Sequence, residues 1–156
     1  MTAFLSTYVN KVDRKGRVSV PAPFRAALSK TGQVGLIAYP SLRLPALEAF
    51  GRDVLDQLNA RRMSQSLEDG DFARVLIGGG DPVVEAVMAL VHDLPFDGEG
   101  RIVLPAALVA HAGIDDQAAF VGRGDRFQIW APEAFETHQR DTLEALRSRY
   151  AGGDLT

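Results

Sequence analysis

The chain carries, at residues 13–24, the stretch Asp13-Arg14-Lys15-Gly16-Arg17-Val18-Ser19-Val20-Pro21-Ala22-Pro23-Phe24. The same pattern returns at residues 97–108 as Asp97-Gly98-Glu99-Gly100-Arg101-Ile102-Val103-Leu104-Pro105-Ala106-Ala107-Leu108. Both copies read Asp-x-x-Gly-Arg, then apolar-x-apolar, then Pro-Ala and a further apolar residue. Two copies are too few for a solenoid, so we expect a duplicated unit whose halves pack together as a pseudo-dimer.

Each copy predicts a turn, a strand and a helix, in that order. Asp13 can accept backbone hydrogen bonds and Gly16 can adopt a positive φ, which together indicate a tight hairpin turn. Val18 and Val20 alternate with polar residues, as in a half-buried strand, and Pro21 suits the first turn of a helix. The second copy repeats this plan at Asp97, Gly100, Ile102, Leu104, Pro105 and Leu108.

Arg17 and Arg101 directly follow the two turns, and we expect them beside the hairpin tips, on the outward side. A short β-ribbon that bears arginine fits the major groove of DNA, where a guanidinium can pair with O6 and N7 of guanine. The alternative is structural, because each arginine could simply brace its turn through the aspartate four residues earlier. For one isolated motif the structural alternative would be the stronger.

Charge is distributed unevenly along the 156 residues. Residues 1–30 hold six lysines and arginines against the single Asp13, a charge of +5, so the rest of the chain must carry −8 to give the net −3. This asymmetry suggests a basic contact surface on an acidic body, although six basic residues on a solvated face would give the same count. The absence of cysteine excludes disulfides, thiolate metal sites and cysteine nucleophiles.

Two amphipathic helices are predicted from apolar residues at helical spacing. The first covers residues 45–62, after Pro45, with Leu47, Phe50, Val54 and Leu58 on its apolar face. The second covers about 133–150, with Phe135, Leu143, Leu146 and Tyr150. Between them, Gly78-Gly79-Gly80-Asp81-Pro82 marks a boundary, so we expect one repeat in residues 1–80 and the other in residues 81–156.

The sequence offers little for catalysis, and we expect no enzyme activity, no cofactor and no metal site. The nucleophile-elbow, phosphate-loop and His-Glu-x-x-His motifs do not occur, and His92, His111 and His138 lack metal-ligand spacing. The most apolar stretch, residues 83–91, is far too short to cross a bilayer, and no secretory signal is visible. We therefore expect a cytoplasmic protein without a membrane partner or a small-molecule substrate.

The duplicated motif resembles the MraZ family, whose halves belong to the AbrB-like group. The resemblance covers nearly the whole chain and is strongest at residues 13–21, at residues 97–105, and where Phe120-Val121-Gly122 leads to Phe127-Gln128-Ile129-Trp130. It implies an α+β fold, namely a duplicated swapped-hairpin β-barrel with flanking amphipathic helices. It also implies a bacterial transcriptional regulator that binds direct repeats in the promoter of the division and cell-wall gene cluster and assembles into rings.

The resemblance assigns DNA contact to the hairpin turn, which here means Arg14, Lys15 and Arg17, with Arg101 in the second copy. The second turn has Glu99 where the first has Lys15, and an acidic residue beside phosphates weakens binding, so we expect the first copy to dominate. A second departure is the segment from Gly78 to Asp97, which is longer than we expect between the halves. Its apolar residues could form an extra packing element or a modified subunit interface: Val83, Val84, Val87, Met88 and Val91.

The expected partners are double-stranded DNA and further copies of the chain. A single hairpin neutralises only a few phosphates, so a ring would be needed to combine several weak, salt-sensitive contacts into a tight one. Regulation would be repression by occlusion of the promoter on the nucleoid. The rival hypothesis is an AbrB-like antitoxin, which resembles one copy of the motif followed by a flexible tail that wraps a toxin. The two copies and the packed C-terminal helix expected here favour MraZ.

Overall fold

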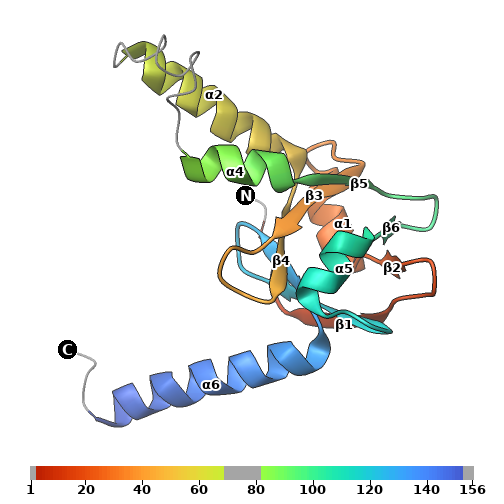
Figure 1. Cartoon of the computed structure of the whole chain (residues 1–156), viewed down its shortest axis with the longest axis vertical. Helices are drawn as coiled ribbons and strands as arrows, with labels where there is room; N and C mark the ends of the chain where they lie inside the picture. The colour runs from red at the N-terminus through yellow and green to blue at the C-terminus, as the bar shows by residue number, and fades with distance from the viewer. Residues whose placement is uncertain (1–2, 69–81, 153–156) are drawn as a thin grey trace.

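The structure is a computed structural model that describes residues 3–68 and 82–152, and it has an α+β fold (Figure 1). The first half contains, in chain order, β1 (Thr7–Lys11), β2 (Arg17–Ser19), α1 (Ala22–Ser29), β3 (Gly35–Pro40), β4 (Ala46–Phe50) and α2 (Arg52–Glu68). The second half contains α4 (Pro82–Leu90), β5 (His92–Pro95), β6 (Arg101–Val103), α5 (Ala106–Ala112), β7 (Gln117–Gly122), β8 (Phe127–Trp130) and α6 (Pro132–Ala151). Apart from α4, the two halves therefore have the same order of elements.

Six strands form one antiparallel sheet in the order β1-β7-β8-β4-β3-β5. β1 pairs with β7 of the other half, with Thr7 opposite Val121, and β5 pairs with β3, with Pro95 opposite Gly35. β4 and β8 pair at the centre of the sheet. Each half therefore supplies its first strand to the hairpin of the other half, and one sheet contains strands from both.

The strands do not close into the barrel that the resemblance implied. β2 and β6 form a separate two-stranded ribbon, and the edge strands β1 and β5 do not pair with each other in the described residues. The ribbon strands have three residues each, and Pro21 and Pro105 follow them closely without an N–H to extend the ladder. The ribbon is thus too short to join the two edges. The assignment to the AbrB-like group stays a prediction.

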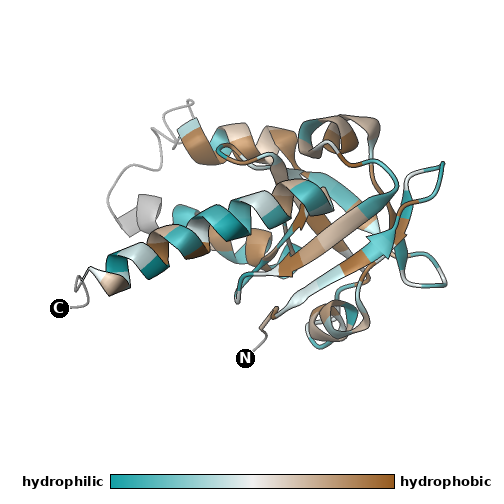
Figure 2. Ribbon diagram, turned by 90° about the horizontal axis from the view of Figure 1, so that it is seen from below, coloured by the Kyte–Doolittle hydropathy of each residue, from teal (hydrophilic) through white to brown (hydrophobic). Residues whose placement is uncertain are grey.

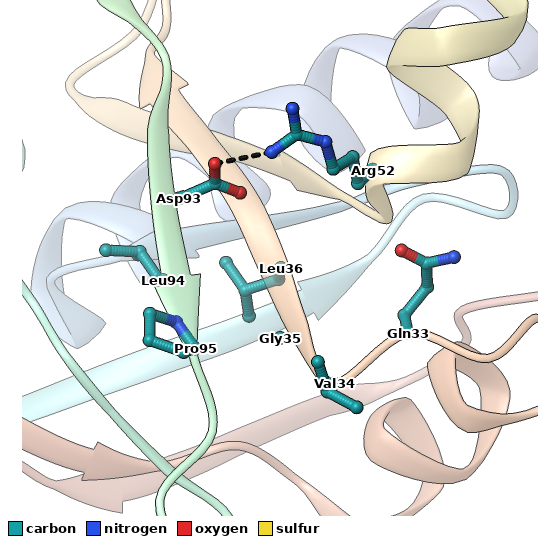
Figure 3. A pocket seen from close by; sticks show the side chains of 8 residues that line it. All are labelled: Gln33, Val34, Gly35, Leu36, Arg52, Asp93, Leu94 and Pro95. Carbon is teal, nitrogen blue, oxygen red and sulfur yellow. Dashed lines mark hydrogen bonds and ion pairs between the residues drawn. The ribbon is translucent and has the colours of Figure 1, made fainter.

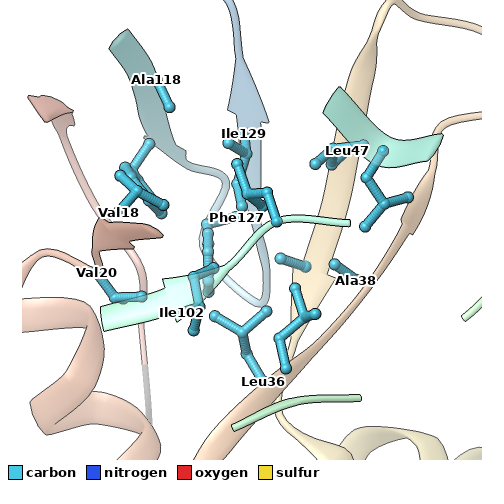
Figure 4. Close-up of a cluster of buried hydrophobic side chains, with 14 of the residues drawn as sticks. Val18, Val20, Leu36, Ala38, Leu47, Ile102, Ala118, Phe127 and Ile129 are labelled. Atoms are coloured by element: carbon cyan, nitrogen blue, oxygen red, sulfur yellow. The ribbon is translucent and has the colours of Figure 1, made fainter. Parts of the chain in front are cut away.

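The ribbon, α1 and α5 cover one face of the sheet and form the main core (Figure 4). Phe24 of α1 lies against Phe127 of β8, with ring centroids 4.9 Å apart, and Val18 lies opposite Ile102 in the ribbon. All four side chains are buried, and burial of such a side chain stabilises a fold by about 1.5–3 kcal/mol. The predicted strand, proline and helix are confirmed in both copies, because their apolar residues hold the ribbon on the sheet.

The helix predicted over residues 45–62 is wrong in its first part. Leu47 and Phe50 lie in β4, and α2 begins only at Arg52. The segment Ala46-Leu47-Glu48-Ala49 is rich in helix-favouring residues, but β4 lies between β3 and β8 and all four residues are buried. Pairing on both sides and burial of both faces therefore override the local preference.

The helix predicted over residues 133–150 is confirmed as α6, but the expectation that it is packed holds only for its start. Phe135 lies against the buried Trp130, with ring centroids 5.7 Å apart. Further along, Leu146 and Tyr150 are 36% and 51% exposed. The helix projects from the sheet, and Figure 2 shows it as mostly hydrophilic with short hydrophobic bands. Leu146 and Tyr150 are exposed because the apolar residues of α6 continue along the helix beyond its contact with the sheet.

The predicted boundary at Gly78–Pro82 lies outside the described residues except for Pro82, which begins α4. α4 contains most of the apolar residues for which the sequence suggested an extra packing element, and it lies beside α2 (Figure 1). The division into residues 1–80 and 81–156 stays a prediction.

Candidate nucleic-acid interface

The first turn joins β1 to β2 and is shaped by Asp13. Its Oδ1 accepts hydrogen bonds from the backbone N–H groups of Lys15 and Arg17, both at 2.9 Å, and its carbonyl accepts the N–H of Gly16 at 3.0 Å. Gly16 has φ +80°, which glycine adopts without steric cost. The bond from the Arg17 N–H is the main reason why the pKa of Asp13 lies below its ordinary value. The turn therefore contains an ionised carboxylate at neutral pH.

Arg17 begins β2 and is held by the same carboxylate. Its Nε donates to Asp13 Oδ2 at 2.6 Å, so the contact required by the structural alternative is present. This bond uses one of the five N–H donors of a guanidinium, and no partner for the two terminal nitrogens is found in the part of the chain that the structure describes. Arg17 can therefore brace its turn and still present donors to a ligand.

Arg14 and Lys15 form the tip of the first turn. Both are exposed, and within residues 3–68 and 82–152 neither side chain has a hydrogen bond or an ion pair. Their charges are therefore not neutralised by a neighbour, and the tip is a basic projection from the molecule.

The second turn, between β5 and β6, has the same backbone hydrogen bonds. Asp97 Oδ1 accepts the N–H of Glu99 at 2.8 Å and that of Arg101 at 2.9 Å, and Arg101 Nε donates to Asp97 Oδ2 at 2.8 Å. Glu99 also approaches Arg101, with Oε2 3.7 Å from Nη1. The hydrogen bond to Asp97, together with the charges of Asp97, Glu99 and Asp13, raises the pKa of Arg101. This arginine thus faces two carboxylates of its own turn, whereas Arg17 faces one.

The ribbon brings the two turns together. In the antiparallel pair, Arg17 lies opposite Val103 and Arg101 lies opposite Ser19. Side chains alternate between the faces of a strand, and the neighbours of these four residues point into the core. The two arginines that the sequence predicted from separate copies therefore share the outer face of one ribbon.

Arg25, on α1, entered the sequence argument only as part of the basic charge, but the structure places it against the second turn. Its Nε donates to the carbonyl of Val20 at 3.0 Å. A Cβ at Gly100 would lie 2.6 Å from Arg25 Cζ, so the guanidinium covers that glycine. The corresponding residue of the second copy is Val109, which cannot make the reciprocal contact. No sequence signal indicates this contact, because it joins one half to the turn of the other.

A cavity of about 280 Å³ lies beside β5 at the edge of the sheet (Figure 3). Its charged groups are Arg52 and Asp93, which form an ion pair with Nη1 and Oδ2 2.6 Å apart. The two groups neutralise each other, and the described lining residues include no serine, threonine, histidine or lysine. This cavity therefore does not add a second charged contact surface.

The three histidines lie in separate places. His92 is in β5, His111 Nε2 is 3.0 Å from the carbonyl oxygen of Leu44, and the ring of His138 lies 4.9 Å from that of Trp130. Among the residues that the structure describes, no three metal-ligating side chains gather in one group. No described helix is both long enough and apolar enough to cross a membrane.

Comparison with known proteins identifies the family. A family model described as "MraZ protein, putative antitoxin-like" matches residues 91–150. The protein named "Transcriptional regulator MraZ" of Rickettsia akari (strain Hartford) is 46% identical over 142 residues, which cover 88% of this chain and 87% of that protein. Proteins of the same name from Rickettsia bellii (strain OSU 85-389) and Rickettsia rickettsii (strain Sheila Smith) are 46% and 47% identical with the same coverage. The resemblance seen in the duplicated turn is confirmed, and the chain belongs to the MraZ family.

Proposed function

We propose that this protein is a DNA-binding transcriptional regulator that recognises direct repeats in the promoter of the bacterial division and cell-wall gene cluster. The observation that carries the proposal is the pair of Asp-x-x-Gly-Arg turns, which meet in one ribbon with Arg17 and Arg101 on its outer face. Relatives that cover most of the chain are named transcriptional regulators, which supports a regulatory rather than an enzymatic role.

Arg17 is the proposed base-reading residue. Because its Nε is held by Asp13, the terminal nitrogens have a defined direction and are available to O6 and N7 of a guanine in the major groove. One bidentate pair of this kind contributes about 1–3 kcal/mol of discrimination between bases. Arg14 and Lys15 at the exposed tip would contact phosphates, and Arg101 would add a weaker contact from the same face of the ribbon.

Tight binding would require several copies of the chain. A single turn reaches only a few phosphates, so one subunit should bind weakly and lose affinity steeply with salt. We propose a homo-oligomeric ring, in which rotationally related subunits present identical turns to successive repeats and raise the effective concentration. Occupation of the repeats would block the promoter, so regulation would be repression. The protein would act in the cytoplasm, on the nucleoid.

Gel-shift titration of Arg17→Ala on a fragment with tandem promoter repeats tests the proposal. We expect specific affinity to fall by about 100-fold or more, because each of several subunits is deprived of a base pairing worth about 1–3 kcal/mol, while the sedimentation coefficient stays unchanged. Arg43→Ala removes an exposed arginine between β3 and β4 and should bind like the unmodified protein. Unchanged affinity of Arg17→Ala would refute the role of Arg17. A footprint upstream of the protein's own gene without protected repeats would refute the target.

A DNA-binding antitoxin is the alternative function. The description of the matching family model includes the words "antitoxin-like", and the exposed Leu146 and Tyr150 of α6 could contact a partner protein. The duplicated turn favours the regulator, because the antitoxins of the alternative resemble a single copy of the motif followed by a flexible tail. Co-purification of a small toxin at a 1:1 ratio from the native host would favour the antitoxin instead.

A further inference from the structure

The outer face of the ribbon carries four side chains, namely those of Arg17 and Ser19 from β2 and of Arg101 and Val103 from β6. The loops that precede the two strands project from the same side of the molecule (Figure 1). Three of the four side chains are polar or charged. The exception is Val103, which is 53% exposed and lies opposite Arg17, the arginine proposed to read a base.

The hydrogen bonds of the ribbon determine how close Val103 lies to Arg17. The N–H of Leu104 donates to the carbonyl of Gly16 at 2.9 Å, so these two residues form a hydrogen-bonded pair directly beside the pair of Val103 and Arg17. Hydrogen-bonded and non-hydrogen-bonded pairs alternate along an antiparallel ladder. The pair of Val103 and Arg17 is therefore of the non-hydrogen-bonded type, in which the side chains are closest, with Cβ atoms about 4.5–5.5 Å apart.

An apolar side chain in the major groove has one specific target, the C5-methyl group of thymine. This group projects from the edge of the base into the groove, which suits a side chain as short as that of Val103. Cytosine would instead present its N4–H donor to the valine, and that donor would lose its hydrogen bond to water. Because adjacent base pairs are about 3.4 Å apart, Val103 faces the base pair that Arg17 contacts or the next one.

We infer that Val103 contacts the C5-methyl group of a thymine within one base pair of the guanine that Arg17 reads. The inference rests on the proposed function and deepens it, because it names a second base of the recognised sequence. Ser19 occupies the position in the first copy that corresponds to Val103. The ribbon thus has an apolar contact beside Arg17 and a hydroxyl beside Arg101, so it distinguishes the two directions of the DNA, as recognition of direct repeats requires.

The exposure of Val103 does not by itself indicate a ligand, because β-branched residues favour strands and single apolar residues are common on protein surfaces. Val9 of β1 is also an exposed valine in a strand, with 48% of its surface exposed. It lies opposite Ala119, which is buried on the face of the sheet away from the ribbon. The position beside Arg17 is what distinguishes Val103, and Val9 is its matched control.

Base analogues in one repeat of the promoter fragment test the contact by gel shift. Deoxyuridine in place of thymidine removes only the methyl group, and 7-deazaguanine in place of guanine removes only the N7 acceptor. We expect one deoxyuridine substitution to weaken binding of the unmodified protein by about 4-fold, the effect of burying one methyl group. Val103→Ser should bind the thymidine and deoxyuridine fragments equally. The sensitive thymine should lie within one base pair of a guanine whose N7 matters to the unmodified protein but not to Arg17→Ala.

Two further variants show whether the effect belongs to the apolar side chain of Val103. Val103→Ile keeps an apolar, branched side chain and should still prefer thymidine to deoxyuridine. Val9→Ser should show the same preference as the unmodified protein. All these variants should keep the melting temperature of the unmodified protein, because both valines are exposed and β2 already has a serine, Ser19, at the position that corresponds to Val103.

Three results would overturn the inference. Either no deoxyuridine substitution weakens binding, or Val103→Ser is as sensitive to deoxyuridine as the unmodified protein, or the sensitive thymine lies more than one base pair from the guanine of Arg17. If a guanine that depends on Arg17 is found in any of these cases, the inference fails and the proposed function stands. If the unmodified protein does not bind the promoter fragment specifically, both fail.

Discussion

The turn at Asp13 and the turn at Asp97 have the same backbone and opposite charge at their tips. In each turn, the Oδ1 atom of the aspartate accepts two backbone N–H groups and the Oδ2 atom accepts the arginine Nε. The tips differ, because the first has Arg14-Lys15 and the second has Gly98-Glu99. Tip side chains are not needed for these hydrogen bonds, so they can set the charge independently. The comparison shows that different residues determine the shape of the turn and the charge that it presents to a ligand.

The largest effect should follow when the first turn receives the tip of the second. The double variant Arg14→Gly, Lys15→Glu changes the charge of each subunit by −3, and we expect promoter affinity to fall by about 100-fold or more. The melting temperature should stay the same, because both side chains are exposed. Gel shifts at several salt concentrations should also show a salt slope reduced by about 0.9 for each phosphate that the variant no longer neutralises. Unchanged binding would mean that the Asp13 turn does not bind the DNA.

The next effect concerns the two turn glycines, Gly16 and Gly100. Alanine at either position requires a left-handed backbone, with φ +80° and +76°, which costs about 1–2 kcal/mol. At Gly16 the new Cβ would also lie 3.0 Å from the carbonyl oxygen of Leu104, whereas at Gly100 it would meet the flexible side chain of Arg25. Urea unfolding should therefore show a larger loss of stability for Gly16→Ala than for Gly100→Ala. The reverse order would indicate that Arg25 is held rigidly on the second turn.

A smaller effect of opposite sign should follow when the second turn receives a basic tip. Glu99→Lys removes the carboxylate 3.7 Å from Arg101 and adds a cation to the tip of the second turn. We expect promoter affinity to rise by about 3- to 10-fold at low salt and the increase to shrink at high salt, since the added charge is exposed and screened. Glu99→Gln should give part of the increase. If neither variant changes affinity, the second turn does not approach the DNA.

The smallest effect is on stability at acidic pH. Hydrogen bonds, chiefly from the N–H groups of Arg17 and Arg101, lower the pKa values of Asp13 and Asp97 below the ordinary 3.8. A lowered pKa contributes stability above the unfolded value, and that stability is lost as the pH falls from about 4 through the folded value. Melting curves between about pH 7 and pH 2.5 should show a smaller fall for the Asp13→Asn, Asp97→Asn double variant. Equal falls would indicate that other carboxylates dominate.

The features that could be predicted from the sequence depend on interactions between residues that are close together in the chain. The hydrogen bonds of Asp13 reach Lys15 and Arg17, and Gly16 needs only its own φ. The alternation of Arg17 and Val18 then determines which side chains face outward, so the position of the arginines on the outer face follows from the sequence pattern. α6 was likewise visible as a stripe at helical spacing, although the stripe does not reveal that only its first turns pack.

The features that could not be predicted from the sequence depend on contacts between residues that are far apart in the chain. β4 was predicted as part of a helix because Leu47 and Phe50 continue the helical spacing of Val54 and Leu58, and only the neighbouring strands β3 and β8 make it a strand. The exchange of β1 and β5 between the halves has no local signal, nor does the guanidinium of Arg25 over Gly100. These features depend on which segments of the chain pack against each other in the folded protein.

The amino-acid sequence by itself determined the duplicated turn, strand and helix, because an aspartate acceptor, a glycine with positive φ and a proline act within a few residues of their position. The tertiary structure alone decided the strand order of the sheet, the strand conformation of β4 and the ribbon that unites the two turns. Those outcomes depend on burial between segments about 80 to 110 residues apart in the chain, and burial of whole faces outweighs the weak local preference of a few residues.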